Sequence, residues 1–258
     1  MTIREYARPD SLGRAYELLM RDEGNEIVAG LTMLKTSDRS IATAIDLSDL
    51  GLDYVREEEG FLKLGAMLTL RPLERDERCR EAFSGALARA VEHVGGIQLR
   101  SHITIGGTLA LRSAYSELLT VMLAVGAEVA LYRQGIAPLA DFLEQPHGRD
   151  IITEVRLPLR AARCILEGLR NSYLEHPLLC IAAAGCGKDI AIAVGARPGR
   201  ARLAKRAMAA WKAGHGAREA GTIASEEMDF GDDLQASAWY RRKICVSLVA
   251  KALGDAIL

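Results

Sequence analysis

Two short glycine-containing stretches of this sequence combine residue types that could hold an anionic ligand. Residues 29–34, Ala-Gly-Leu-Thr-Met-Leu, follow the apolar residues Ile27 and Val28 and are called the first bend; residues 104–108, Thr-Ile-Gly-Gly-Thr, are called the second bend. Glycine has no Cβ atom, so a bend built on it can turn its backbone N–H groups towards a bulky anion. Threonine hydroxyls at the rims add further hydrogen-bonding groups. Two such bends could close on one diphosphate.

The commonest nucleotide-binding motifs do not account for either bend. No Gly-Lys-Ser or Gly-Lys-Thr follows the glycines, and neither bend has the spacing Gly-x-Gly-x-x-Gly. Taken singly, each bend is equally well explained as a hairpin or as a turn between a strand and a helix. Both interpretations stay open on these residues alone.

The flanking sequence predicts the elements that position the bends. A strand over 27–29 leads into the first bend. Apolar residues at spacings of three and four predict a helix from Ala82 to Val94 that ends at Gly95 and Gly96. The second bend is predicted as a loop, after which the chain crosses residues 109–115 and enters an apolar helix over 116–125. Strands and helices in this mixture predict an α+β domain that ends near residue 160. Strands over 178–184 and 189–196, with helices over 201–214 and 235–258, predict a smaller second domain.

Composition bounds the class of protein. The chain has 258 residues, of which 49% are hydrophobic, enough to bury a sizeable core in one large domain or two unequal ones. With 33 basic and 34 acidic side chains, there is no charge excess of the kind that binds nucleic acid or an anionic membrane. Five cysteines without a Cys-x-x-Cys motif indicate reduced thiols in a cytosolic protein, and the sequence has no signal-peptide pattern at its start. Thiolate ligands for an iron–sulfur cluster, if one is involved, are expected in another chain.

The order of these motifs resembles the FAD-binding subunit of the xanthine dehydrogenase and carbon monoxide dehydrogenase family, the molybdenum hydroxylases. That family has Ala-Gly-Gly-Thr-Asp-Leu where this chain has its first bend. It then has Ile-Arg-Asn-x-Ala-Thr-Ile-Gly-Gly-Asn where this chain has Leu-Arg-Ser-His-Ile-Thr-Ile-Gly-Gly-Thr, residues 99–108. Further similarity lies in residues 6–9, 64–73, 116–119, 154–158 and, more weakly, 237–242, so the resemblance covers nearly the whole chain. Its most specific piece is Thr-Ile-Gly-Gly preceded by Arg100. We interpret Arg100 as a structural residue that pairs with a carboxylate and braces the second bend.

The resemblance implies an α+β fold with a two-part FAD-binding domain of the PCMH/CO dehydrogenase flavoprotein type over residues 1–160, its lobes covering about 1–55 and 56–160. It also implies a smaller C-terminal α+β domain, of the CO dehydrogenase flavoprotein type, over residues 161–258. The cofactor is FAD, and the residues assigned to it are Val28, Ala29, Gly30, Leu31, Thr32, Met33, Leu34, Thr104, Gly106, Gly107, Thr108, Glu117 and Ile152. Glu117 stands where the family has an aspartate that holds a hydroxyl group of the cofactor. A carboxylate there is equally well explained as a cap of the following helix.

By the same resemblance, the chain is an electron-transfer subunit of a molybdenum-hydroxylase complex in the cytoplasm. Its partners are a molybdopterin-binding subunit and a [2Fe–2S] subunit, and the final acceptor is NAD or another molecule. Leu31, Met33 and Thr108 replace a glycine, an aspartate and an asparagine of the family pattern. The alternative hypothesis is therefore a non-catalytic scaffold subunit that has lost tight flavin binding. The five histidines are scattered without the spacing of metal ligands, so no metal site is expected.

Overall fold

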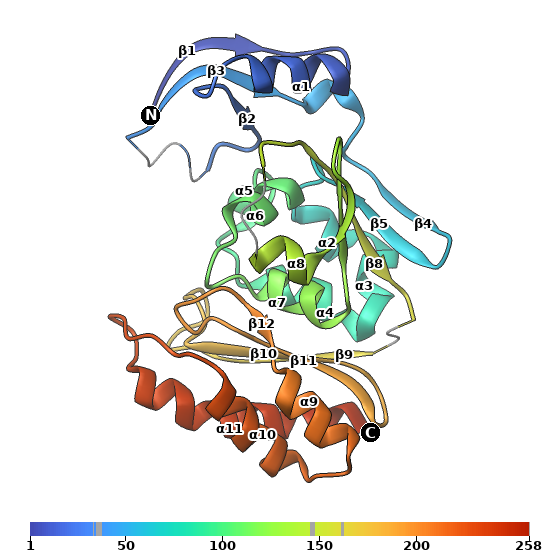
Figure 1. Ribbon diagram of the computed structural model, residues 1–258, viewed down its shortest axis with the longest axis vertical. Coiled ribbons are helices and arrows are strands. Elements are labelled where there is room, and N and C mark those ends of the chain that lie inside the picture. The colour runs from blue at the N-terminus through green and yellow to red at the C-terminus, as the bar shows by residue number, and fades with distance from the viewer. Residues whose placement is uncertain (33, 35–37, 145–147, 161–162, 258) are drawn as a thin grey trace.

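The computed structural model describes residues 1–32, 34, 38–144, 148–160 and 163–257, which form three sheets stacked along the long axis of the molecule (Figure 1). The N-terminal sheet has three parallel strands in the order β1-β3-β2. Helix α1 packs on this sheet through Ala15 and Leu19, which contact Ile45. The elements of this part are β1 (Thr2–Ala7), α1 (Leu12–Arg21), β2 (Glu26–Val28), β3 (Ser40–Asp46) and the 3-10 helix η2 (Ser48–Leu50).

The middle sheet has five antiparallel strands in the order β4-β5-β8-β6-β7, with a group of short helices against it. Its strands are β4 (Val55–Glu58), β5 (Phe61–Gly65), β6 (Glu128–Leu131), β7 (Gly135–Pro138) and β8 (Ile152–Pro158). The helices are α2 (Arg71–Arg75), α3 (Glu77–Glu81), η3 (Ala82–Gly85), α4 (Ala86–Glu92), α5 (Ile97–Arg100), α6 (Ile105–Leu111), α7 (Glu117–Ala124) and α8 (Leu139–Glu144).

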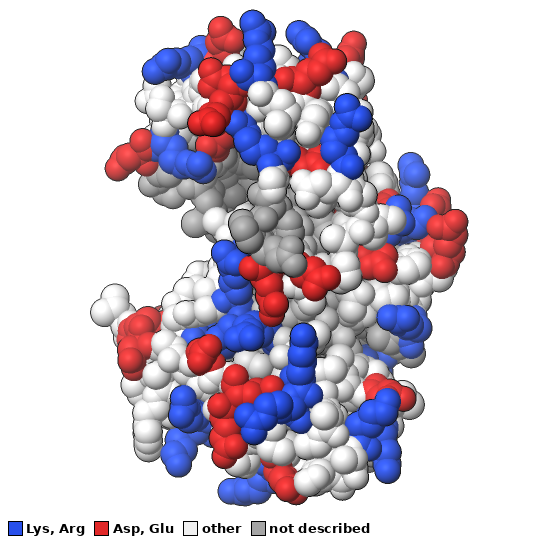
Figure 2. Space-filling view, in the orientation of Figure 1, with Lys and Arg blue, Asp and Glu red and all other residues white. Residues whose placement is uncertain are grey.

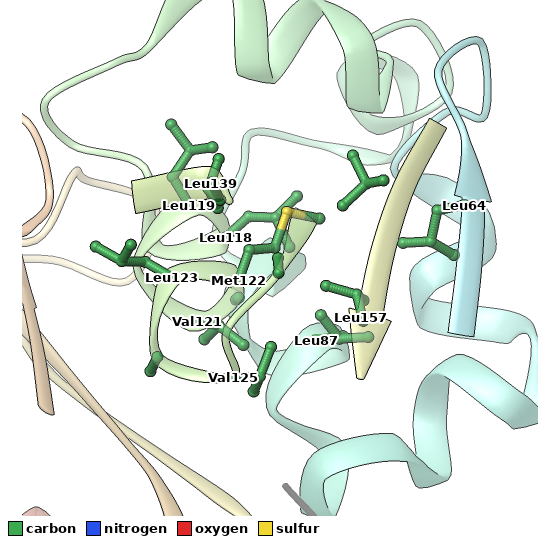
Figure 3. Close-up of a cluster of buried hydrophobic side chains, with 14 of the residues drawn as sticks. Leu64, Leu87, Leu118, Leu119, Val121, Met122, Leu123, Val125, Leu139 and Leu157 are labelled. Carbon is green, nitrogen blue, oxygen red and sulfur yellow. The ribbon is translucent and has the colours of Figure 1, made fainter. Parts of the chain in front are cut away.

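Helix α7 is the centre of the largest hydrophobic core, and each of its residues is buried. Figure 3 shows Leu118, Val121 and Met122 of this helix among side chains from β5, α4 and β8. A helix that is apolar all round is stable only when every side of it is covered. The third sheet supplies the remaining cover.

The C-terminal sheet has four antiparallel strands in the order β12-β11-β10-β9 and separates α7 from the C-terminal helices. Side chains alternate between the two faces of a strand. Accordingly, Ala182 and Ala184 of β10 pack in the core of α7, whereas Ile181 and Ala183 pack with α10 and α11 on the other face. The elements are β9 (Cys164–Leu169), β10 (Leu179–Cys186), β11 (Asp189–Gly195), β12 (Arg202–Leu203), α9 (Lys205–Lys212), α10 (Ala217–Glu227) and α11 (Ala238–Ile257).

The α+β fold class predicted from the sequence is confirmed, and several local predictions need correction. The helix predicted from Ala82 begins at Ala86, because Phe83 and Ser84 both adopt left-handed backbone conformations. Gly106 and Gly107 lie inside α6 and not in a loop. Strands β1, β7 and β9 and helix α10 were not predicted. Among the described residues, no helix combines the length and apolar character needed to cross a membrane.

A buried arginine ties the start of α11 to the loop before it. The side chain of Arg241 is fully buried and donates to the carbonyl oxygens of Leu178, Gly231 and Ala236 and to Asp233 Oδ2 at 2.7 Å. Burial acts to raise the pKa of Asp233, but hydrogen bonds from Arg241, two backbone amides and Tyr115 hold it well below its usual range. An acid with a depressed pKa stabilises the fold above its unfolded pKa of about 3.9, and that stability is lost as the pH falls.

We therefore expect Asp233→Asn to lower the free energy of unfolding by about 2 kcal/mol at pH 7, because a charge-assisted hydrogen bond to a buried arginine is lost. The same variant should lose less stability than the parent chain between pH 5 and pH 2. Urea unfolding at a series of pH values measures both effects. Asp53→Asn, at an exposed carboxylate before β4, is the control and should change little. Equal acid sensitivity in the parent and Asp233→Asn would contradict this account.

Candidate functional site

The first bend lies against the backbone that immediately precedes the second bend. Gly30 has φ +53°, and a Cβ atom placed on it would lie only 1.9 Å from the carbonyl oxygen of His102, just before the second bend. No other residue type fits this contact without moving one of the bends. The sequence therefore predicted the neighbourhood of the two bends correctly, and Gly30 is the residue that permits it.

The first bend offers backbone donors for an anion. Leu31 also adopts a left-handed conformation, with φ +52°, and its amide donates to the carbonyl oxygen of Ala29. The amides of Gly30 and Thr32 have no acceptor within the described part of the chain. Successive backbone N–H groups in such a turn form a concavity that binds anions. Leu31 and Leu34 pack their side chains against the cluster that contains Val28 in the N-terminal sheet. Met33 lies outside the described residues.

The second bend uses its amides differently from the prediction. Thr104 caps the N-terminus of α6, and its Oγ1 accepts from the amide of Gly107 at 3.0 Å. The amide of Gly106 donates to the carbonyl oxygen of Ala66 at 2.7 Å. Both amides expected to face an anion are thus satisfied within the protein, and this part of the prediction is wrong for this conformation. Gly106 is needed for another reason, because a Cβ atom there would lie 2.9 Å from the same oxygen of Ala66.

Thr108 and Ile152 lie close to the second bend but contribute in different ways. Thr108 donates through its Oγ1 to the carbonyl oxygen of Thr104 at 2.9 Å, one turn back in α6. Ile152 begins β8 and packs against the main core. Its neighbour Thr153 accepts from the amide of Ala66, the residue against which α6 rests. Strand β8 therefore supports the second bend through Ala66.

Arg100 braces the second bend, as the sequence indicated. Its Nε lies 3.0 Å from Glu74 Oε2, and its Nη1 donates to the carbonyl oxygen of Gly95 at 2.7 Å. The same Nη1 reaches the carbonyl oxygens of Glu92 and Val94 at 3.2 Å, at the end of α4. A guanidinium is suited to this role because it presents several donors in a fixed plane. Arg100 thus fixes the chain between α4 and α5, and the interpretation is confirmed.

Glu117 is committed to a partner that the sequence did not identify. Ser116 caps α7, with its Oγ accepting from the amide of Leu119 at 3.2 Å, so the capping interpretation of Glu117 is wrong. The carboxylate instead accepts from Arg170 Nη2 at 2.6 Å, with His93 Nδ1 3.8 Å away. Burial raises the pKa of Glu117, and Arg170 opposes that rise. No sequence spacing linked Arg170 to Glu117, because Glu117 begins α7 and Arg170 follows β9, 53 residues later.

Tyr173 continues this cluster to the surface. Its ring packs edge-on against His93 with centroids 4.8 Å apart, and its hydroxyl donates to Glu92 Oε1 at 2.6 Å. The pKa of His93 is lowered by burial and by the nearby charge of Arg170, so this imidazole favours the neutral form. Residues 163–170 contain no aromatic residue. Tyr173 follows just beyond that stretch.

The bends lie beside a hollow in the molecular surface. In the space-filling view, the molecule is indented on its left side, between the N-terminal sheet and the body formed by the other two sheets (Figure 2). The amides of Gly30 and Thr32, which have no acceptor among the described residues, and the close backbone contact at Gly30 are the features that fit the diphosphate of a dinucleotide. The residues present therefore fit FAD through the first bend, with the second bend acting as its rigid support.

Comparison with known proteins defines the class of protein. Residues 2–160 match the family described as the FAD binding domain in molybdopterin dehydrogenase. The chain belongs to this family; it is an FAD-binding oxidoreductase subunit of the molybdenum hydroxylase type, as the resemblance implied.

Individual relatives agree with this assignment. The protein YgfM of Escherichia coli strain K12 is 34% identical over 190 residues, which cover 72% of this chain and 71% of YgfM. The nicotine 6-hydroxylase medium subunit of Paenarthrobacter nicotinovorans is 26% identical over 277 residues, which cover 97% and 96% of the two chains. In fold, the chain is similar to reconstituted CO dehydrogenase from Oligotropha carboxidovorans, with a TM-score of 0.88, 20% identity and coverage of 99% and 98%.

The pair of Glu117 and Arg170 yields a prediction on pH. An acid whose pKa is raised in the folded state stabilises the fold below its unfolded pKa, and this contribution is lost as the pH rises through the folded value. Arg170→Met removes the opposing charge, so we expect the free energy of unfolding to fall by about 3 kcal/mol at pH 8. Part of this loss should be recovered at pH 5, where Glu117 takes up a proton. Thermal unfolding at both pH values measures this.

Arg14→Met provides the matched control, since Arg14 pairs with Glu17 on the exposed face of α1. That variant should lower the free energy of unfolding by no more than about 0.5 kcal/mol at either pH. A loss for Arg170→Met that is the same at pH 5 and pH 8 would show that Glu117 does not titrate as described.

Proposed function

We propose that this chain is the electron-transfer subunit of a molybdenum-hydroxylase complex. In this proposal it receives electrons from a [2Fe–2S] partner and passes them to NAD or another acceptor. The observation that carries the proposal is the first bend, which presents two amides without an acceptor among the described residues, in a conformation held by contact with the backbone just before the second bend. A protein that only needed a turn at this position would not require the backbone contact at Gly30.

Each part of the site has a separate role in holding the cofactor. The amides of Gly30 and Thr32 bind the diphosphate, and Val28, Ala29, Leu31 and Leu34 form the backbone on either side. Met33, outside the described residues, is assigned to the cofactor from the family resemblance alone. Thr104, Gly106, Gly107 and Thr108 build the helix start that supports the first bend, with Ile152 behind it. Glu117 holds the polar end of the site through Arg170. These assignments to the cofactor are part of the proposal.

The chemistry belongs to the bound cofactor, and the chain controls its surroundings. A flavin accepts two electrons one at a time and gives them up with a proton as a hydride equivalent, which suits a junction between one-electron and two-electron carriers. No side chain of this subunit needs to act as a general acid or base. The residues around the bends bind and orient the cofactor, and the packed core behind α7 excludes water from one side of the site.

The partners in this proposal are a molybdopterin-binding subunit and a [2Fe–2S] subunit, and the location is the cytoplasm. The relatives include medium subunits of nicotine 6-hydroxylase and of glyceraldehyde dehydrogenase, whose names imply larger assemblies. We further propose that residues 1–160 hold the cofactor and residues 161–258 form a separate domain that completes the site. The substrate is then chosen by the molybdenum subunit.

The second candidate is a scaffold subunit that has kept the fold but binds flavin weakly. Two observations favour it. Leu31 holds a left-handed conformation that costs a residue with a Cβ atom about 1–2 kcal/mol, and the amides of Gly106 and Gly107 are already bonded within the protein. The two candidates differ in whether the purified chain carries flavin. An absorption spectrum, with mass analysis of the small molecule released on denaturation, decides between them.

Gly30→Ala tests the role of the first bend. The new methyl group would meet the carbonyl oxygen of His102, so the bend must move and its amides lose their alignment. We expect the dissociation constant for FAD to rise about tenfold or more. A change of this size corresponds to the loss of one hydrogen bond to a charged group. Flavin fluorescence during titration with FAD measures the change.

Gly60→Ala is the matched control, because Gly60 also has a positive φ, +77°, but no atom lies within 4 Å of a Cβ placed there. It should lose about 1 kcal/mol of stability and retain FAD as the parent chain does. If Gly30→Ala bound FAD as tightly as Gly60→Ala, the first bend would not be the diphosphate site. A parent chain that releases no flavin and does not bind it would favour the scaffold.

A further inference from the structure

We propose that a second anion site, specific for a phosphate group, lies in an arginine-lined cavity between the end of α8 and the segment that joins β11 to β12. The cavity has a volume of about 280 Å³ and is lined by Leu143, Glu144, Arg197, Arg200, Ala201 and Arg202. Three guanidinium groups from one short segment thus border a single surface cavity. Neither the family assignment nor the bends account for them.

Arg197 is the anchor of this cavity. It is 94% buried, since only 6% of its surface is exposed, yet no carboxylate lies within ion-pair distance of it in the described chain. Its two terminal nitrogens donate to the carbonyl oxygens of Asp229 and Arg200, each at 2.7 Å, and its Nε has no partner among the described residues. Burying a charge without an opposite charge is costly. A bound anion would supply both the missing charge and the missing acceptor.

The other cations of the cavity are also poorly neutralised. Arg200 donates to the carbonyl oxygen of Leu143 at 2.8 Å and forms no ion pair with a described residue. Arg202 has two carboxylate neighbours, Glu144 at 3.8 Å and Asp229 at 3.7 Å, and both of these are largely exposed. Ion pairs with such exposed carboxylates contribute little to stability. Burial and the positive charge of Arg202 lower the pKa of Arg197, and the carboxylate of Asp229 opposes this.

A fourth arginine extends the positive field. Arg112 ends α6 in a left-handed conformation and lies 4.6 Å from the centre of the Phe142 ring. Burial and the charge of Arg200 lower its pKa, so Arg112 and Arg200 are close enough to repel each other. The amide of Ala196 donates to the carbonyl oxygen of Ala114 at 3.0 Å, which fixes the arginine segment against the chain that follows α6.

A phosphate group is the anion that suits this arrangement. Guanidinium groups bind phosphate oxygens through paired hydrogen bonds, and a doubly charged oxyanion can satisfy several of them at once. The cavity is at the lower limit of ligand sites, which begin at about 300 Å³, so a free phosphate or a small phosphate ester fits and a complete dinucleotide does not. The site is also separate from the bends, because no residue of either bend lines the cavity.

Isothermal titration calorimetry on the FAD-loaded chain tests the proposal, with inorganic phosphate and adenosine 5′-monophosphate as separate ligands. The double variant Arg200→Gln/Arg202→Gln removes two guanidinium groups that are exposed enough to be replaced without unfolding the chain. We expect it to weaken binding at least about tenfold, while Arg206→Gln, an exposed arginine on α9 outside the cavity, leaves binding unchanged. Arg197→Met, if it folds, should abolish binding.

The outcomes separate the ligand sources and separate this site from the flavin site. Saturable binding of both ligands with equal affinity assigns the cavity to free phosphate, and tighter binding of the monophosphate assigns it to a phosphate ester. No saturable binding of either overturns the proposal and leaves the proposed electron-transfer function untouched. Loss of FAD from Arg200→Gln/Arg202→Gln also overturns it, because the arginines would then belong to the flavin site. A chain that binds phosphate but no FAD would overturn the proposed function alone.

Discussion

The arrangement of the site depends on one backbone contact, between Gly30 and the carbonyl oxygen of His102. It joins the small N-terminal sheet to the helices of the middle sheet at a point where any side chain would force them apart. Both sides of the contact are held from behind. Arg100 fixes the chain before the second bend through Glu74 and the end of α4, and the amide of Leu70 donates to the carbonyl oxygen of Ile103. The first bend can therefore keep its amides aligned without a ligand, which lowers the cost of ordering it on binding.

Helix α7 supports this site from the opposite side. Its apolar side chains are enclosed by the middle sheet and by one face of the C-terminal sheet (Figure 3), so its first turn is held rigidly in place. That turn carries Glu117, one of the few charged groups in the core region. Its partner Arg170 directly follows β9, so this ion pair connects α7 to the C-terminal sheet. Burying such a pair is favourable only when its partners are fixed, and the packing of α7 provides that.

The sequence predicted the positions of the bends but not how each one works. Motif order located both bends and Arg100, because these depend on local residue types. The amide of Gly106 donates to Ala66, about forty residues earlier, and no local pattern reveals that hydrogen bond. The helix expected from Ala82 failed at Phe83 and Ser84, where tertiary packing imposes a left-handed kink on residues with Cβ atoms. Arg170 and Arg197 were missed for the same reason, since their environment comes from distant elements. The role of Leu31 could be stated only as a constraint on φ until the structure gave its conformation.

Amide hydrogen exchange of the chain with and without FAD tests the central claim most directly, because it reports on individual backbone N–H groups. The account predicts that FAD slows exchange at Gly30 and Thr32, whereas Gly106 and Gly107, which already donate within the protein, exchange slowly in both states. Exchange at Gly30 and Thr32 that stays fast in the presence of saturating FAD would contradict it. So would protection by FAD that appears only at Gly106 and Gly107.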